Sequence, residues 1–440
     1  MIQTLAQLRS GQLSGVTQLC LNEQLKEFPK EVFTLADSLQ VLDLSHNQIS
    51  RLPAEFSCLK NLRILFLSHN RFESVPEILA QCPALEMIGF KSNQITEFAE
   101  DALPLQTRWL ILTDNKIMRL PDSIGKLQNL QKLALAGNEI QNIPAAMAQC
   151  KNLELVRLSA NQLNEIPDAF LHLPKLSWLA VAGNAFNRES TELHSDIVSV
   201  PLSTIALADI LGEGASGVIH KAQWLQQPPS LKGASKKIAV KIFKAEVTSD
   251  GYPADELANC LRAGEHKSLV KVIAQIQESE SKGLVMELIP SDYRNLGMPP
   301  SLQTCTRDTF NQRKFTVADI LTITSAMAET MVHLHKLHIS HGDLYAHNIM
   351  VDDDANALLG DFGAASDISM LPAKQKKLIQ AVEVRAFACL LDDLLSICRA
   401  PESFKIGAKL IILRDECMQE DVSARPDFKA ISKRLKALSK

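Results

Sequence analysis

One short stretch of the chain holds the side chains best suited to chemistry. Residues 341–363 read HGDLYAHNIMVDDDANALLGDFG. Asp343 and Asn348 lie five residues apart in one loop, and Asp361 follows a short apolar run and precedes Phe362. Transfer of a phosphoryl group from a nucleotide needs a carboxylate that orients the attacking hydroxyl and two oxygen ligands that hold Mg²⁺ against the phosphates. The types and spacing of these three side chains therefore indicate a magnesium–nucleotide site.

This stretch resembles the catalytic loop and DFG segment of the protein kinase superfamily. The HxDxxxxN phrase alone is shared with kinases of small molecules, whereas its pairing with a DFG at this separation is specific. The resemblance covers roughly residues 204–440. It implies that Asp343 is the catalytic aspartate, that Asn348 and Asp361 bind Mg²⁺, and that ATP is the phosphoryl donor.

A glycine-rich turn and a lysine precede this stretch at the positions that the family requires. In LGEGASGVIHKA, Gly212, Gly214 and Gly217 leave room for backbone amides to approach phosphates. Such a turn alone could be a flexible hairpin, but it precedes Lys241 in an apolar run that resembles the VAIK strand. A lysine on a buried strand needs an anionic partner, which favours contact with the α- and β-phosphates. The resemblance implies a nucleotide pocket formed by Leu211, Gly212, Gly214, Gly217, Val218, Ala239, Lys241, Glu287 and Ile289.

The family pairs this lysine with a glutamate on the next helix. The segment ADELANCLRAGEHKSLVKV offers Glu256 for this role, and Glu265 is the alternative. Either carboxylate could also be only a solvated charge on a helix face. We expect Glu256 to be the partner. Further along the chain, the apolar pattern of VADILTITSAMAETMVHLHKLH predicts a helix that leads into the catalytic loop.

Several departures from the family concern the substrate rather than the chemistry. Gly342 replaces the arginine that usually captures a phosphorylated activation segment, and Tyr345 stands where Ser/Thr kinases typically carry lysine. Only nineteen residues separate Gly363 from Glu383, and no APE-like motif lies among them. Glu383 itself stands where the family usually has an aspartate that starts a buried helix and braces the catalytic loop. We therefore expect a minimal activation segment and a reduced docking surface for a peptide substrate.

The first half of the chain is an internal repeat. Asparagines close LxLxxN-like phrases at steps of 23 residues, with one step of 22. These are Asn47, Asn70, Asn93, Asn115, Asn138, Asn161 and Asn184. A period of this length with this phrase is the leucine-rich repeat signature, with one strand per repeat, and an irregular first copy makes about eight. Stacked repeats share one continuous core, and a proline after most strands is expected to start the return on the convex side.

Side chains that flank the inward leucines should point to the concave face of such a solenoid. On adjacent repeats these side chains are large and apolar, and we expect one exposed patch that binds a protein partner. The patch comprises Ile64, Phe66, Met87, Trp109 and Ile111. The alternative is that some of these positions lie under neighbouring loops.

Composition excludes several classes of protein. The balance of 46 basic and 50 acidic residues argues against a general nucleic-acid binder. Nine cysteines without CxxC or CxH spacing indicate neither a disulfide framework nor a zinc site, which is typical of a reduced, cytoplasmic setting. No stretch approaches the length of a membrane span. We expect an amphipathic cap helix in 1–18, an α/β leucine-rich repeat solenoid in 19–190, a linker in 191–203 and an α+β bilobal protein-kinase-like domain in 204–440.

Three functions follow from these residues. The retained Lys241, Asp343, Asn348 and Asp361 favour an active ATP- and Mg²⁺-dependent kinase of a protein substrate, with serine or threonine as acceptor, over a pseudokinase scaffold. The HGD phrase and the short activation segment resemble aminoglycoside and choline kinases, whereas the DFG, the glycine-rich turn and the repeats do not. The whole arrangement resembles intracellular leucine-rich repeat protein kinases of bacteria, in which the repeats recruit or sense a partner.

Overall fold

The chain folds into two compact units, which are described separately. The computed structural model describes residues 3–190, 197–214, 216–233, 235–244, 247–278, 281–311, 314–398 and 405–439. By packing, the units are Met1–Leu176 and Ser177–Lys440. Of the expected linker 191–203, residues 191–196 lie outside the described part of the chain.

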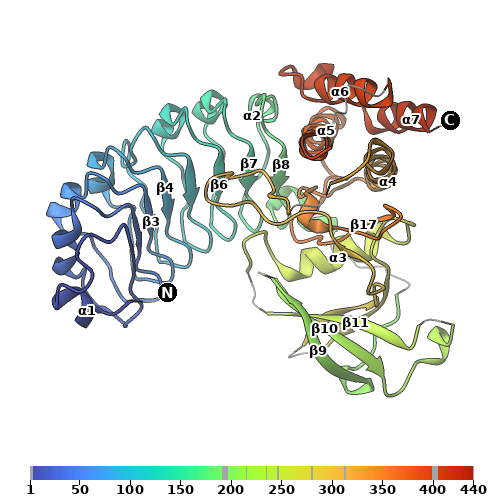
Figure 1. Ribbon diagram of the computed structural model, residues 1–440, viewed down its shortest axis with the longest axis horizontal. Helices are drawn as coiled ribbons and strands as arrows, with labels where there is room; N and C mark the ends of the chain where they lie inside the picture. Colours follow the sequence, from blue (N-terminus) through green and yellow to red (C-terminus); the bar gives the residue numbers. More distant parts are fainter. Residues whose placement is uncertain are drawn as a thin grey trace. The chain divides into compact units, whose positions relative to one another are not determined.

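The first unit is built from short parallel strands, one per repeat (Figure 1). These are β1 (Gln18–Cys20), β2 (Val41–Asp43), β3 (Ile64–Phe66), β4 (Met87–Gly89), β5 (Trp109–Ile111), β6 (Lys132–Ala134) and β7 (Leu155–Arg157). Each strand pairs with the next in a regular register, as in Leu42 with Leu65 and Leu65 with Ile88. The central residue of every strand from β1 to β7 is fully or almost fully buried, so the strands together form one continuous core.

The asparagines bind consecutive repeats to each other. The Asn70 side chain donates from Nδ2 to the carbonyl of Leu44, one repeat earlier, at 2.9 Å and to its own Leu67 at 3.1 Å. Its Oδ1 accepts from the amide of Ile49 at 2.9 Å. The same pattern recurs at the other asparagines of this unit, which explains why the phrase requires a side chain with both a donor and an acceptor.

Short helices form the return of most repeats. The residue before each is a proline, whose fixed φ suits the start of a helix. They are η2 (Ala54–Cys58), η3 (Glu77–Gln81), η4 (Asp122–Lys126), η5 (Ala145–Gln149) and α2 (Asp168–Leu171). η1 (Lys30–Leu35) follows Pro29 in the same way. The expected role of these prolines is therefore confirmed.

The N-terminal helix is shorter than expected. Among the described residues 3–18, only Leu5–Arg9 form a helix (α1), whose Leu8 is buried. Gly11 and Gly15 both adopt positive φ, which ends any helical continuation. The apolar face expected of this cap helix comprises Ile2, Leu5 and Leu8, of which Ile2 lies outside the described residues.

The concave apolar patch is more buried than expected. Met87 is 2% exposed and Ile64 is 8% exposed, so these two residues belong to the core and not to an open surface. Phe66, Trp109 and Ile111 are half-buried. The reason is lateral packing along the sheet: the Phe66 ring lies 2.8 Å from where a Cβ on Gly89 would stand, so large side chains cover their neighbours.

The second unit begins with the last repeat phrase, whose strand is β8 (Trp178–Ala180), followed by η6 (Ala185–Ser190). Residues 198–202 do not behave as a free linker in this unit. Val198 and Leu202 pack on the core of a five-stranded sheet, and Val200 lies within that core. The amide of Val200 donates to the carbonyl of Gln275 at 2.9 Å.

That sheet is antiparallel and forms the smaller lobe (Figure 1). Its order is β12-β13-β11-β10-β9. The strands are β9 (Ile205–Glu213), β10 (Gly217–Trp224), β11 (Lys237–Phe243), β12 (Val272–Gln277) and β13 (Lys282–Glu287). Helix α3 (Pro253–Ala263) buries Leu257 and Leu261 against Leu284 of β13.

Helices dominate the larger lobe. They are α4 (Val317–Lys336), α5 (Ala373–Ser396), α6 (Lys405–Cys417) and α7 (Phe428–Leu438). Small sheets are formed by β14 (Arg294–Asn295), β16 (Ile349–Val351) and β17 (Ala357–Leu359), and by β15 (Ile339–Ser340) with β18 (Ser366–Asp367). An α+β bilobal unit therefore follows the repeats. No helix within the described residues is long and apolar enough to cross a bilayer.

Two features of this lobe position the site. α4 starts with a capping box at Thr316 and ends just before β15, which delivers the chain to His341. α5 starts after Pro372, ten residues earlier than Glu383, so Glu383 lies inside the helix and not at its start. The extended part of the activation segment is correspondingly short.

Candidate functional site

A buried ion pair lies at the centre of the smaller lobe. Lys241, in the middle of β11, contacts the Oε1 atom of Glu256 on α3. Lys241 is 7% exposed and Glu256 is 2% exposed. Burial acts to lower the pKa of Lys241, but the carboxylates of Glu256 and Asp361 outweigh it, so the pKa of Lys241 is raised and the ammonium stays charged.

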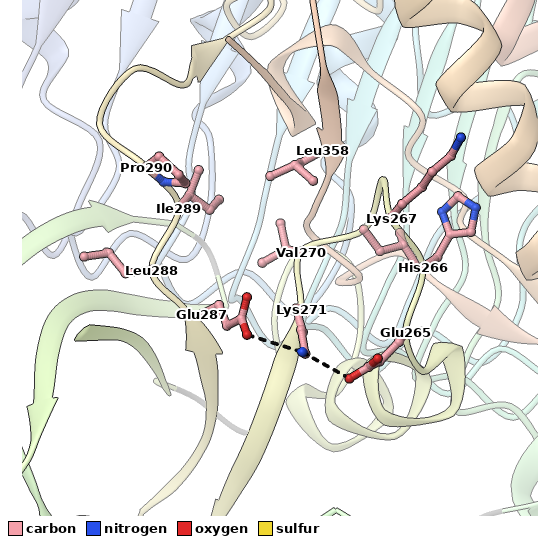
Figure 2. A pocket seen from close by; sticks show the side chains of 11 residues that line it. Glu265, His266, Lys267, Val270, Lys271, Glu287, Leu288, Ile289, Pro290 and Leu358 are labelled. Atoms are coloured by element: carbon pink, nitrogen blue, oxygen red, sulfur yellow. Dashed lines mark ion pairs between the residues drawn. The ribbon is translucent and has the colours of Figure 1, made fainter. Parts of the chain in front are cut away.

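The alternative partner, Glu265, is directed elsewhere. Figure 2 shows Lys271 between the carboxylates of Glu265 and Glu287, each 3.3 Å from its Nζ atom. These residues and Ile289 line a pocket of about 460 Å³. Its lining includes neither Lys241 nor Asp361, but it shares Glu287 and Ile289 with the nucleotide pocket that the sequence predicts.

The catalytic loop brings Asp343 and Asn348 together. The Asn348 amide donates from Nδ2 to Asp343 Oδ2 at 2.9 Å and to the Asp343 carbonyl at 3.0 Å. Because the amide nitrogen is used in this way, Asn348 offers its carbonyl oxygen to a cation. The 3-10 turn η9 (Ala346–Asn348) spaces the two side chains.

Buried polar groups support the backbone of this loop. His341 is fully buried, and its Nε2 lies 3.1 Å from the Gly360 carbonyl, directly before the DFG. Glu383 Oε1 accepts from the Gly342 amide at 2.9 Å, and its Oε2 lies 2.7 Å from His335 Nε2. Glu383 thus contacts the loop as the family's aspartate would, and the extra methylene is accommodated because His335 holds the second oxygen.

Asp361 has a left-handed backbone with φ 52°. Its Oδ1 accepts from the Gly363 amide at 3.1 Å, which fixes the carboxylate within its own turn. The side chain is exposed while Phe362 is buried against His341. The DFG therefore presents its carboxylate and anchors itself through the phenyl ring.

The glycine-rich turn joins β9 to β10. An added Cβ on Gly212 or Gly214 would meet no described atom within 4 Å, so the backbone there is open. Gly217 differs, because a Cβ would lie 2.4 Å from the carbonyl of Ile242 on the neighbouring strand. Leu211, beside this turn, is 53% exposed.

The remaining expected pocket residues lie on the same sheet. Val218 pairs with Ile242 across β10 and β11, and Ala239 is buried opposite Met286. Glu287 ends β13 and Ile289 follows it, both half-buried. Val218 and Ala239 thus lie on β10 and β11, the strands that carry Gly217 and Lys241, whereas Glu287 lies on the neighbouring β13.

The activation segment is short and tied to its surroundings. Only residues 364–372 separate the DFG from α5. The Asn259 amide of α3 donates to the Ala365 carbonyl at 2.9 Å, and Arg262 forms an ion pair with Asp367. These contacts link the helix that carries Glu256 to the segment that follows Asp361.

Some polar residues of the site lie outside the positions that the sequence motifs indicate. Asp308 lies in a stretch without clear pattern, yet its Oδ1 is 2.7 Å from His347 Nδ1 and its Oδ2 accepts from the His347 amide at 3.1 Å. Burial acts to lower the pKa of His347, but Asp308 outweighs it and the pKa is raised. No local signal marks Asp308. His341 could be found only as a neighbour of the motif, whereas the resemblance to kinases already indicated Glu383.

The donor set suits Mg²⁺ held together with phosphates. Asn348 and Asp361 supply hard oxygen atoms, the ligand type that Mg²⁺ prefers. Within the described residues, no three His, Cys, Asp or Glu side chains are grouped to bind a metal ion by themselves. This arrangement fits an ion held by one or two protein groups plus the oxygens of a nucleotide.

Comparisons with known proteins match both parts of the chain to families. Residues 205–397 match the family of protein tyrosine and serine/threonine kinases, and residues 18–72, 106–163 and 128–186 match leucine-rich repeats. The chain is 25% identical over 277 residues to the rat megakaryocyte-associated tyrosine-protein kinase, covering 53% of either chain. It is 24% identical over 283 residues to human tyrosine-protein kinase Srms, covering 55% of this chain and 54% of that protein.

A further relative is a Dictyostelium discoideum protein named "Probable serine/threonine-protein kinase", 28% identical over 178 residues, which are 37% of this chain and 9% of that protein. The chain thus spans about half the length of the first two relatives and a small part of the third. Tyrosine kinases and a serine/threonine kinase both occur among them.

Proposed function

Because the chain carries a protein kinase domain joined to leucine-rich repeats, we propose that it transfers the γ-phosphoryl group of ATP to a hydroxyl of a protein substrate. The observation that carries this proposal is the buried pair of Lys241 and Glu256, next to Asp361. A binding-only protein has no physical need for a lysine held charged in a lobe core at the cost of its desolvation.

Each polar group has a defined task in this proposal. Asp343 accepts the proton of the attacking hydroxyl, and Asn348 keeps the Asp343 carboxylate in orientation. Lys241 binds the α- and β-phosphates, and Glu256 keeps the ammonium directed toward them. Mg²⁺, when bound at Asn348 and Asp361, would neutralise charge on the phosphate oxygens. The open amides of Gly212 and Gly214 would cover the phosphates, with Leu211 against the base.

The test is transfer of labelled phosphate from Mg·ATP by the purified full chain. We expect Asp343→Ala to lower turnover by roughly 10²- to 10⁴-fold with nucleotide affinity retained. Asp353→Ala is the matched control, because Asp353 lies in the same stretch, is exposed and pairs only with a surface arginine among the described residues. Unchanged turnover in Asp343→Ala would contradict the role of Asp343 as the proton acceptor. So would a loss of nucleotide affinity in which the nucleotide-bound variant still turns over at the wild-type rate.

The acceptor that we propose is serine or threonine. Phosphoamino-acid analysis of the labelled protein decides between these residues and tyrosine. Phosphotyrosine as the sole product would overturn this part of the proposal and leave phosphoryl transfer itself in place.

The short activation segment supports a second candidate, transfer to a small alcohol. Residues 364–372 leave little chain between the DFG and α5 on which a peptide could dock. The same assay separates the two candidates when it includes a protein substrate in one arm and aminoglycosides or choline in the other. Label found only on the small alcohol would favour the second candidate.

A further inference from the structure

The last repeat strand lies against the catalytic loop inside the second unit. The indole of Trp178 stacks on the Tyr345 ring, with centroids 4.3 Å apart and planes 8° from parallel. Its Nε1 donates to the Leu344 carbonyl at 3.2 Å. Trp178 is 2% exposed and Tyr345 is 4% exposed, so the contact excludes water. Tyr345 is two residues from Asp343, and the centroid of its ring also lies 5.0 Å from that of the His347 ring.

The same strand continues along the activation segment. The Val181 amide donates to Ser366 Oγ at 3.0 Å, and Ser366 is fully buried. The Val181 carbonyl accepts from Asn184 at 2.8 Å and from Asn187 at 3.2 Å. The asparagine of the repeat phrase thus fixes the peptide that holds Ser366 in place. A strand of the chain itself thus contacts the activation segment, a kind of segment that a phosphate–arginine contact can order elsewhere.

Two close backbone approaches complete the contact. A Cβ on Gly342 would lie 2.6 Å from the Ala364 carbonyl and 2.7 Å from the Leu179 carbonyl, so three chain segments meet there without room for a side chain. A Cβ on Gly183 would lie 2.7 Å from Asp255 Oδ2. Asp255 precedes Glu256 on α3, so residues 178–183 reach the catalytic loop, the segment that follows the DFG, and α3.

We propose that Trp178 is a positioning residue for the phosphoryl transfer proposed above, and that β8 with Val181 holds the catalytic loop and residues 364–367 in their productive arrangement. The inference rests on the proposed function for its catalytic readout only. The strand is a support rather than a block, because the Lys241–Glu256 pair and the Asn348–Asp343 hydrogen bond are both formed while it is docked.

The first arm of the test measures order in the loop and does not depend on catalysis. Hydrogen exchange of the full chain is compared between wild type, Trp178→Ala and Trp178→Phe. We expect Trp178→Ala to accelerate exchange at residues 341–349 and 363–368 by about tenfold or more, with α4 unchanged. Trp178→Phe keeps a ring on Tyr345 and should restore most of the protection. Val41→Ala, at the equivalent strand position in β2, is the control and should change nothing in the second unit.

The second arm separates positioning from simple structural support. Displacement of a catalytic group by about 1 Å can cost on the order of 10² in rate, so Trp178→Ala should lower kcat to that extent while the KM for ATP stays within about twofold. Trp178→Phe should lose less than about fivefold. A rise in kcat would overturn the proposal, since the strand would then restrain the enzyme. Equal exchange and equal kcat in Trp178→Ala and wild type would also overturn it.

Two further outcomes remain decisive. If the wild type transfers no phosphate, the proposed function fails, and the exchange arm still decides whether β8 orders the loop. If Trp178→Ala also exposes α4, the unit has unfolded, and Ser366→Ala takes its place, because it removes the acceptor of the Val181 amide together with the 3.4 Å hydrogen bond from Ser366 Oγ to the Ala364 carbonyl. Faster exchange confined to Val181 and residues 363–368 supports the proposal, and unchanged exchange there refutes it.

Discussion

Gly342 offers the sharpest test of how closely the loop, the activation segment and β8 are packed. Its φ is +71°, a region that costs alanine about 1–2 kcal/mol. The added Cβ would also stand 2.6 Å and 2.7 Å from two carbonyl oxygens, both of them backbone atoms that cannot rotate away. Overpacking of this kind costs about 1–3 kcal/mol. We therefore expect Gly342→Ala to destabilise the second unit by about 2–5 kcal/mol.

The assay is thermal unfolding of the full chain, followed by hydrogen exchange of the α4 amides to assign the transition to the second unit. A loss of this size corresponds to a lower Tm by roughly 5–20 °C for a unit of this length. Gly233→Ala is the matched control: its φ is not positive and no described atom lies within 4 Å of the added Cβ. It should leave the Tm unchanged or slightly higher.

The comparison between these variants can refute the reasoning. If Gly342→Ala melts within about 1 °C of Gly233→Ala, the three segments do not meet at Gly342 in solution. If Gly342→Ala keeps its Tm and exchanges faster only at residues 178–183, then β8 moves to make room for the added methyl group. That result would also contradict rigid packing at Gly342.

Two other predictions concern regulation and partners. Activity should not require phosphorylation of the activation segment, because Ser366 is fully buried and the Ser369 carbonyl is already held by Lys376 Nζ at 2.9 Å. Ser369→Ala and Ser369→Glu should therefore have equal kcat, and a large loss in the first that the second restores would contradict this. We also propose that the half-buried rings of Phe66 and Trp109 bind a protein partner. Replacing both with Ser should abolish capture of that partner with basal phosphorylation unchanged, and loss of the far-ultraviolet circular dichroism of the repeats would instead identify the rings as core.

Local patterns made the solenoid and the catalytic loop predictable. Each asparagine contacts backbone atoms within its own phrase and at one repeat's distance, so the constraint recurs in the sequence at every period. Asp343 and Asn348 are joined by a hydrogen bond across five residues of one loop. Contacts between residues that are close in sequence fix their spacing, so the spacing alone predicts them. Lys241 and Glu256 are further apart, and the resemblance to kinases indicated them.

Long-range packing left no comparable trace. Trp178 occupies the same place in its phrase as Met87 and Trp109, and only its neighbours in space distinguish it. Met87 is buried because adjacent strands carry large side chains, which alternation along one strand does not reveal. The early start of α5 did have a signal in Pro372, a residue that commonly precedes a helix.

The contact between Trp178 and Leu344 also sets an order of events during synthesis. The two residues are 166 positions apart, so at about 5–20 residues per second the loop leaves the ribosome roughly 10–30 s after the indole. During that interval the indole has no Tyr345 to cover it. The hydrogen bonds of Asn184 and Asn187 to Val181 need only nearby residues, so they can shape the strand while its partner is still unmade. The repeat phrase thus acts as a template on which the nascent catalytic loop completes its fold.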